Sequence, residues 1–342
     1  MKRVNVGRKG EKTDGLLLKF CYRYDKIGIK EGQGLKVEFV GGRMAELSGI
    51  VIVNKEAGMS SQAVVNRVKK IFGVKKAGHT GTLDPMATGV LPVLIGRAVK
   101  ASEFMLTSDK HYGATLRLGI TTDTEDITGE VLTRSEDIPD EEAVMTAVSA
   151  HIGRIMQTPP MYSALKVGGK KLYEMAREGK VIDRQAREIT VYSIEAKRLS
   201  DTDYYLDIKC SKGTYIRTLC SDIGKMLGCG GAMATLERLS ASGYLIKDSH
   251  TLGELENMKD YERENVVRGV EEIFSGLDIV RLPAFYSRLA HSGLEIYQKK
   301  IETNYPMGSL VRMYDEGGFF ALGEVREYED GLAIKPIRRF DL

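Results

Sequence analysis

The segment GHTGTLDPMATGVL, residues 78–91, is the most informative stretch of the chain. It carries one carboxylate, Asp84, among glycines, threonines and a proline. Glycine is permissive in its backbone angles and proline lacks a backbone donor, so we expect the segment to continue neither a helix nor a central strand. It is predicted to be a stiffened loop that presents an acid. Catalytic groups concentrate on such loops, although composition alone favours an aspartate that begins a turn before Pro85.

Length and composition limit the class of protein. With 342 residues the chain is long enough for two domains and a substantial core. No stretch approaches the roughly 18 apolar residues of a membrane span, and the N-terminus lacks the apolar region of a signal peptide. We therefore expect a cytoplasmic protein with no membrane partner. The four cysteines show no C-x-x-C spacing, so neither a metal site nor a disulfide framework is predicted.

Charge is divided unevenly along the chain. Residues 1–43 carry eleven Lys and Arg against five Asp and Glu, a balance of +6, in a chain whose formal net charge is +3. Residues 44–342 therefore carry −3, so nucleic-acid binding has to rest on local clusters. Clusters of basic residues usually form solvated surface when nothing else supports a role in binding. One cluster is Lys69, Lys70, Lys75, Lys76 and His79, and a second is Lys166, Lys170, Lys171 and Arg177.

The hydrophobic pattern predicts a mixture of strands and helices. Runs of β-branched or alternating apolar residues predict strands at 47–54, 111–118, 189–196 and 204–210. Amphipathic stretches predict helices that begin at Ser60 or Ser61, over 141–152, and from about 213 to 228. From about residue 277 short apolar runs alternate with glycine pairs and show no helical period of any length. This pattern predicts a separate small β domain at the C-terminus.

Five blocks that occur in order carry a resemblance to a known family. They are GIVIVNKEAGMSS (49–61), KAGHTGTLDPMATGVL (76–91), KHYGATLRLG (110–119) with TDTED (122–126), PPMYSALK (159–166) and CSKGTYIRTL (210–219). Over residues 47–342 the chain resembles the bacterial TruB-type tRNA pseudouridine synthases, the tRNA pseudouridine-55 synthases. A single glycine motif matches by chance far more readily than five ordered blocks do.

The resemblance implies both a fold and an activity. The fold is α+β, a mixed and mainly antiparallel sheet with flanking helices (the pseudouridine synthase fold) plus a small C-terminal PUA-like β domain. The catalytic domain would span 44–276 with an RNA-gripping thumb insertion at about 159–188, and the PUA-like domain would span 277–342. The activity is conversion of uridine 55 in the T loop of tRNA to pseudouridine. The family implies no cofactor, no guide RNA and a monomer.

Three residues match catalytic positions of the family. Asp84 matches the carboxylate that attacks the sugar of a flipped-out nucleotide, or that stabilises and deprotonates it. Arg217 matches the arginine that pairs with this carboxylate and keeps it ionised. Tyr215 matches a second active-site tyrosine, placed to help remove the proton from C5. Arg–Asp pairs and packed tyrosines are common in proteins, so only the motif context supports these roles.

Four residues match substrate-binding positions. A base inside folded RNA has no free face until it is extruded, and a flipped base is held by stacking on an aromatic ring. Tyr112 matches the tyrosine that stacks on the target ring. His79 matches the histidine that occupies or supports the flipped-out loop of the RNA. Lys55 matches a motif lysine with a positioning role, and Lys166 lies in the thumb block.

Two departures and two alternatives accompany the resemblance. Many members read KPxG where this chain has KEAG at 55–58, which leaves the turn less preset and removes no chemistry. The C-terminal segment carries few features of RNA contact. One alternative is a non-catalytic RNA-binding or RNA-chaperone protein, and the presence of Asp84 counts against it. The other is a synthase within a guide ribonucleoprotein, and the thumb block at 159–166 counts against that.

Residues 1–43 match nothing in the family. Met44 begins the sequence MAELSGIV, an ordinary start for such an enzyme, and the preceding Gly41-Gly42-Arg43 can be encoded by a purine-rich run of the kind that recruits bacterial ribosomes. We therefore expect Met44 to be the natural start and residues 1–43 to be a non-native extension. The alternative is a basic arm that adds affinity for RNA.

Overall fold

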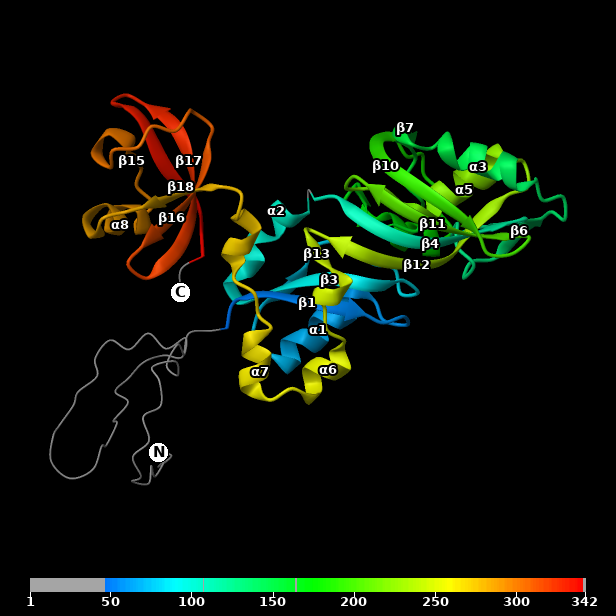
Figure 1. Ribbon diagram of the computed structural model, residues 1–342, viewed down its shortest axis with the longest axis horizontal. Coiled ribbons are helices and arrows are strands. Elements are labelled where there is room, and N and C mark those ends of the chain that lie inside the picture. The colour runs from blue at the N-terminus through cyan, green and yellow to red at the C-terminus, as the bar shows by residue number, and fades with distance from the viewer. Residues whose placement is uncertain (1–46, 107, 164, 341–342) are drawn as a thin grey trace, which may run out of the picture. The chain divides into compact units, whose positions relative to one another are not determined.

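The structure, a computed structural model, describes residues 47–106, 108–163 and 165–340 (Figure 1). The predicted N-terminal extension, residues 1–43, lies outside them. The described chain forms one nine-stranded sheet, one five-stranded sheet and two hairpins of two strands each, with helices beside them. Among these residues no helix is long and apolar enough to cross a membrane.

The nine-stranded sheet has a continuous path of seven strands, and two short strands lie off that path. Every pair is antiparallel except β3 with β12. The path runs β1 (Gly49–Lys55), β3 (Thr88–Ile95), β12 (Gly231–Ala241), β4 (Lys110–Leu118), β11 (Asp203–Cys210), β10 (Arg187–Arg198) and β7 (Gly153–Gln157), while β2 (Ala77–His79) pairs with β3 and β13 (Tyr244–Leu245) with β12.

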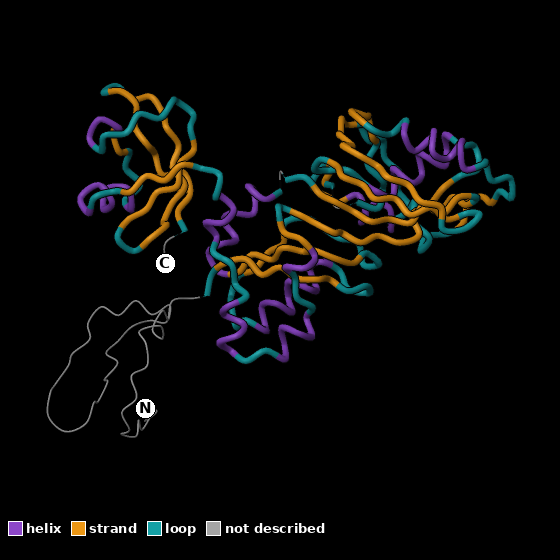
Figure 2. Tube along the Cα trace, in the orientation of Figure 1, coloured by secondary structure: helices purple, strands orange, loops and turns teal. Residues whose placement is uncertain are grey.

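Helices pack against this sheet in two groups (Figures 1 and 2). Near β1 lie α1 (Ser61–Ile71), α6 (Leu252–Asn257) and α7 (Asp260–Asn265), while α3 (Glu141–Ser149) packs against β10 and α5 (Ile216–Met226) packs against β12 and β4. The shorter helices are η1 (Gly96–Ala101), α2 (Ser102–Met105), η2 (Ile246–Asp248) and η3 (Val270–Phe274). The predicted α+β fold class is confirmed, as are the predicted helices that became α1, α3 and α5.

Local sequence explains where α1 begins and which face it buries. Ser60 caps the helix, because its Oγ accepts a hydrogen bond from the Ala63 amide at 3.2 Å. Val64, Val65 and Val68 recur at helical spacing and are all buried, as their pattern predicts.

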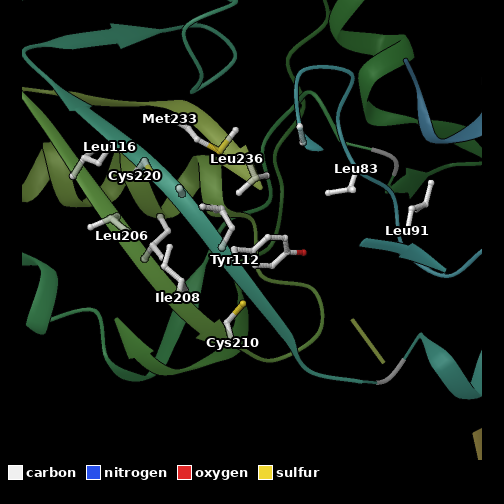
Figure 3. Packing of buried hydrophobic residues seen from close by; sticks show 14 of the residues in the cluster. Leu83, Leu91, Tyr112, Leu116, Leu206, Ile208, Cys210, Cys220, Met233 and Leu236 are labelled. Carbon is white, nitrogen blue, oxygen red and sulfur yellow. The ribbon is translucent and has the colours of Figure 1, made fainter. Parts of the chain in front are cut away.

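A continuous hydrophobic core lies between the sheet and these helices. It joins Val65 of α1, Leu91 of β3, Leu206 of β11 and Leu219 of α5. Figure 3 shows part of it, with Tyr112 of β4 among the aliphatic side chains and its hydroxyl directed toward the segment that carries Leu83. Burial of one leucine stabilises a fold by about 1.5–3 kcal/mol, so the core fixes the strands from which the site residues project.

The expectation that segment 78–91 continues no central strand is wrong for its last four residues. Thr88–Leu91 begin β3, which lies inside the sheet between β1 and β12. Pro92 is tolerated in β3 because of where the ladders fall. On the side away from β1, the β12 ladder covers only Thr88 and Gly89 and the β2 ladder only Val93 to Ile95. Pro92 therefore lies between the two ladders, where its carbonyl accepts from the Thr80 amide at 3.3 Å and no ladder bond requires its missing N–H.

The C-terminal residues form a second sheet. Its order is β14 (Asp278–Arg281), β16 (Leu310–Asp315), β17 (Gly318–Tyr328), β18 (Gly331–Arg339) and β15 (Ile296–Tyr297), and the 3-10 helix η4 (Gln298–Lys300) follows β15. The expectation of no helix in this region is wrong, because α8 (Ala284–His291) follows Pro283. Its eight residues bury only Ser287 and Ala290, too few positions to show a helical period in the sequence.

Ser61 joins α1 to the loop that carries Asp84. Its side chain is buried, and its Oγ both accepts from the Leu83 amide at 2.8 Å and donates to the Leu83 carbonyl at 2.9 Å. One hydroxyl therefore satisfies both backbone groups of the residue that precedes Asp84.

We predict that Ser61→Ala lowers the free energy of unfolding by about 2 kcal/mol, because it leaves two buried backbone groups of Leu83 without a partner. Urea unfolding measures the loss. Ser149→Ala is the matched control, since its exposed Oγ only donates to the Met145 carbonyl, and we expect a change within about 0.5 kcal/mol. Equal effects of the two substitutions would contradict the proposed link.

Candidate active site

A buried lysine holds the loop that carries Asp84 through hydrogen bonds to its backbone. Lys55, fully buried at the end of β1, donates from Nζ to the carbonyl oxygens of Pro85 at 3.1 Å and Ala87 at 2.6 Å, and to that of Glu56 at 3.0 Å. Burial lowers the pKa of Lys55 to about 8. The ammonium donates to loop carbonyls, and its positioning role toward the substrate stays a prediction.

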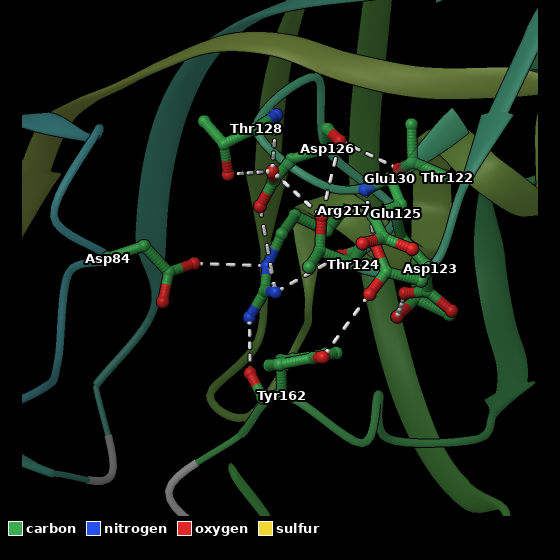
Figure 4. Close-up of polar contacts among 11 residues, drawn as sticks. Asp84, Thr122, Asp123, Thr124, Glu125, Asp126, Thr128, Glu130, Tyr162 and Arg217 are labelled. Atoms are coloured by element: carbon green, nitrogen blue, oxygen red, sulfur yellow. Dashed lines mark hydrogen bonds and ion pairs between the residues drawn. The ribbon is translucent and has the colours of Figure 1, made fainter. Parts of the chain in front are cut away.

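Asp84 faces Arg217 across the site. The Nε of Arg217 lies 3.0 Å from Oδ2 of Asp84 (Figure 4). The Arg217 side chain is only 6% exposed, whereas that of Asp84 is 34% exposed. The carboxylate is therefore paired on its protein side and open on another side, where a substrate can approach it.

Arg217 itself is fixed by two backbone carbonyls and a second acid. Its Nη1 donates to the Thr124 carbonyl at 3.1 Å, and its Nη2 donates to the Tyr162 carbonyl at 2.7 Å. The same Nη1 lies 3.7 Å from Oδ2 of the buried Asp126. Figure 4 shows these groups surrounding the guanidinium. An arginine held in this way presents its Nε to Asp84 in one orientation.

Asp126 is a site residue that the sequence reading did not assign. Its Oδ1 accepts from the Thr128 amide at 2.9 Å, from the Thr128 hydroxyl at 2.5 Å and from the Thr124 hydroxyl at 3.0 Å. The available signal was the TDTED block with Thr128 after it, since threonines two residues before and after an aspartate can both bond to it.

The ionisation of Asp84 reflects opposing influences. Burial raises its pKa above the usual value, the charges of Arg217 and Lys55 lower it, and the charge of Asp126 raises it further. Arg217 is the strongest of the groups that favour the carboxylate. The result is a pKa above the ordinary range for aspartate.

Tyr215 stands immediately before α5, and Gln157 fixes its backbone. The Tyr215 amide donates to Oε1 of Gln157 at 2.8 Å, and Nε2 of Gln157 donates back to the Tyr215 carbonyl at 3.0 Å. This clamp sets the start of the helix that carries Arg217, and the sequence reading missed it. The guanidinium of Arg187 lies 5.1 Å from the Tyr215 ring centroid. The closeness of Tyr215 to the reacting carbon stays a prediction.

Tyr112 and His79 line the inner side of the site. Tyr112 is 7% exposed, and burial raises the pKa of its hydroxyl, with the charge of Asp84 acting in the same direction. Burial lowers the pKa of His79, and the charge of Arg238 lowers it further. Both influences favour the neutral imidazole, and the binding role of His79 stays a prediction. Among the described residues its buried Nδ1 has no hydrogen-bond partner.

A small basic unit follows Pro159 and Pro160. It contains the hairpin of β8 (Lys166–Val167) and β9 (Lys170–Lys171) and the short helix α4 (Leu172–Arg177). Lys171 and Arg177 approach the Tyr173 ring, at 5.3 Å and 5.4 Å from its centroid. The side chain of Lys166 lies outside the described part of the structure, so its predicted role stays a prediction. A second hairpin, β5 (Ile120–Thr122) with β6 (Val131–Arg134), flanks the Asp126 turn, and of its two strands β6 is exposed.

Comparison with known proteins identifies the family. The family model described as the TruB family pseudouridylate synthase N-terminal domain matches residues 69–216, and that of the tRNA pseudouridylate synthase B C-terminal domain matches residues 217–275. The tRNA pseudouridine synthase B of Francisella tularensis subsp. novicida is 40% identical over 81% of this chain and 91% of its own length. That of Francisella philomiragia subsp. philomiragia is 41% identical over the same shares. The chain belongs to the TruB family of pseudouridylate synthases.

The TruB fold of the chain is also similar to solved structures. The crystal structure of a Cbf5-Nop10-Gar1 complex contains a chain that is 25% identical, with a TM-score of 0.65 over 86% of this chain and 85% of that one. The two matched ranges of this chain, 69–216 and 217–275, include Asp84, Asp126 and Arg217. Lys55 lies before them.

We predict that Asp126→Asn lowers the pKa of Asp84. The substitution removes a negative charge that opposes ionisation of Asp84, while the asparagine Oδ1 can still accept from Thr128 and Thr124. Carbon-13 NMR titration of the Asp84 carboxyl measures the change. In the unaltered protein Asp84 should protonate at a higher pH than an ordinary aspartate, and in the variant at a lower pH than in the unaltered protein.

The control for this titration is Asp137→Asn, which removes an exposed charge outside the network. It should leave the pKa of Asp84 unchanged, because solvent screens exposed charges. An Asp84 pKa that rises or stays unchanged in Asp126→Asn would contradict the arrangement of the two acids around Arg217.

Proposed function

We propose that the chain is a tRNA pseudouridine synthase that isomerises uridine 55 of the T loop, with Asp84 as the catalytic carboxylate. Relatives that are 40% and 41% identical to this chain over 281 residues are named tRNA pseudouridine synthase B. The observation that carries the proposal is the pairing of a partly exposed Asp84 with a buried Arg217 in the site of a TruB fold.

The chemistry of isomerisation calls for this pairing. The N1–C1′ bond breaks, the uracil turns, C5 bonds to C1′, and the proton lost from C5 is balanced by one gained at N1. Atoms and electrons balance without a co-substrate. An ionised carboxylate can attack C1′ or stabilise the positive charge that develops on the sugar. Arg217 favours that ionised form, and the exposed side of Asp84 leaves room for the sugar.

Three further residues have roles in this proposal. Tyr112 stacks on the flipped uracil, which requires its ring to become accessible when RNA binds. Tyr215 helps to remove the C5 proton, with its backbone held by Gln157. His79 occupies the space vacated by the flipped nucleotide, and its buried Nδ1 is available to a group of the RNA.

The domain division is part of the proposal. Residues 44–276 form the catalytic domain, and about 159–188 form a thumb that grips the T arm through Lys166 and neighbouring cations. Lys171 and Arg177 provide charge near Tyr173 within this segment. Phosphate contacts supply most nonspecific affinity for RNA. Residues 277–342 form a PUA-like domain that adds RNA contacts.

An assay of the purified protein on an unmodified T-arm stem-loop, without guide RNA, tests the activity. Nucleoside analysis after digestion should show one pseudouridine, and none when cytidine replaces uridine 55. Binding without turnover would favour the non-catalytic RNA-binding alternative. Turnover that appears only with an added guide ribonucleoprotein would favour the arrangement suggested by the Cbf5-containing neighbour.

We predict that Asp84→Asn reduces the single-turnover rate constant at least about 1,000-fold, because the amide can neither attack C1′ nor offset its positive charge. Affinity for the stem-loop should stay within about tenfold, since RNA binding is spread over phosphate contacts. The exposed Asp201→Asn variant is the control and should keep the full rate. Substantial turnover by Asp84→Asn would remove Asp84 from the mechanism.

We predict that replacing Lys166, Lys170 and Lys171 together by alanine weakens RNA binding and flattens its salt dependence. Each lost phosphate contact should reduce the slope of log K against log salt concentration by about 0.7–0.9, because fewer counterions are released. The matched control is alanine at Lys197, Lys209 and Lys225, three exposed lysines outside the segment. The same slope change in both triple variants would show a general charge effect and no thumb.

A further inference from the structure

Arg238 is a fully buried arginine in the middle of the nine-stranded sheet. It is 1% exposed and lies in β12, the strand between β3 and β4. Its register partners are Gly89 of β3 on one side and Tyr112 of β4 on the other. Arg238 therefore stands between the strand that follows the Asp84 loop and the strand that carries the proposed stacking tyrosine.

The guanidinium of Arg238 bonds to both arms of the Asp84 loop. Its Nε donates to the Val90 carbonyl at 2.7 Å, and its Nη2 donates to the Gly81 carbonyl at 3.2 Å. Gly81 precedes Asp84 and Val90 follows it. One planar group thus fixes the distance between the two arms from which Asp84 projects.

Within the described part of the chain, no carboxylate forms an ion pair with Arg238. Buried cations are ordinarily paired with an acid, because desolvation of an unpaired charge is unfavourable. The charge of Arg238 also acts on neighbouring groups, because it lowers the pKa of Lys55 and of His79. Arg238 donates to two loop carbonyls and also lies close enough to the Tyr112 hydroxyl to oppose the rise in its pKa that burial causes, so its contacts join the Asp84 loop to β4.

The loop is shaped around Arg238. Gly89 has φ +98°, and a Cβ at this position would lie 2.3 Å from the Arg238 carbonyl oxygen, so only glycine permits this approach. Gly81 has φ +131°, which also favours glycine, and a Cβ there would lie 3.5 Å from Nη1 of Arg238. The arm at Gly89 thus approaches the backbone of Arg238 closely, and the arm at Gly81 contacts its guanidinium.

We propose that Arg238 is a positioning residue for the isomerisation: by joining Gly81 to Val90 it places Asp84 against Arg217 and beside Tyr112. The planar fork of arginine reaches two separate carbonyls, whereas the ammonium of lysine is a single point of donation. The role is geometric, so retaining the charge alone does not preserve it. This inference rests on the proposed catalytic role of Asp84.

Arg238→Lys and Arg238→Met test the inference in the full-length protein with the T-arm stem-loop. Displacement of a reacting group by about 1 Å can reduce a rate about 100-fold, and we expect both variants to lose at least about that much in single-turnover rate constant. The dissociation constant for RNA should stay within about threefold, because phosphate contacts are elsewhere. A purely structural role would not lower the rate constant while leaving the affinity for RNA nearly unchanged.

Arg263→Met is the matched control. Arg263 also donates to two backbone carbonyls, those of Met258 at 3.0 Å and Ile71 at 2.9 Å, but it lies in α7, away from the Asp84 loop. Its loss should lower stability, measured by urea unfolding, and leave the rate within about threefold of the unaltered protein. An equal rate loss in Arg263→Met would overturn the inference, because general destabilisation would then explain the result.

Comparison with Asp84→Asn separates the two proposals. Full activity of Arg238→Lys together with inactive Asp84→Asn would overturn the positioning role alone. Activity of Asp84→Asn would overturn the proposed function, and the role of Arg238 with it.

If neither Arg238 variant folds, a crystal structure of the unaltered protein with the stem-loop decides. Both carbonyl bonds must persist beside the bound uridine, and a guanidinium turned from Gly81 or Val90 toward the RNA would overturn the inference.

Discussion

In the proposed mechanism a carboxylate that acts on a sugar has to remain ionised, and the pair of Asp84 with Arg217 favours that form. The two residues come from distant parts of the chain, a loop after β2 and the first turn of α5. Arg217 also holds the carbonyls of Thr124 and Tyr162 and approaches Asp126. One buried guanidinium therefore gathers four segments, and the site exists only when the sheet has brought them together.

Buried cations meeting backbone carbonyls are a recurring feature of this site. Lys55 bonds to Pro85 and Ala87, and Arg238 bonds to Gly81 and Val90. Hydrogen bonds that involve a charged group contribute about 1.5–3 kcal/mol each, which offsets part of the desolvation of these cations. Lys55 bonds to residues that follow Asp84, and Arg238 bonds to residues on either side of it, so side chains of β1 and β12 together define the loop. A loop held this firmly keeps its acid in place while RNA binds.

The positive charge near Asp84 also acts on the acid itself. Arg217 and Lys55 favour its ionised form, whereas burial and Asp126 oppose it. The opposing influences leave an acid whose pKa is raised but whose strongest partner is a fixed cation. Such a balance suits a group that must bear a charge in the ground state and lose part of it on contact with the sugar.

The sequence alone determined the elements whose signal is local. The valine stripe of α1 and the acid in the GHTGTLDPMATGVL segment followed from local pattern, whereas the pairing of Asp84 with Arg217 followed only from the family motifs. Tertiary structure decided what depends on contacts between distant segments. Pro92 lies within β3 because it falls between the β12 and β2 ladders, and α8 is too short to show a helical period in the sequence. Gln157 at the end of β7 holds the backbone of Tyr215 at the start of α5. Arg238 gives no local signal, because a lone arginine in a strand acquires its role only from the loop carbonyls that folding places around it.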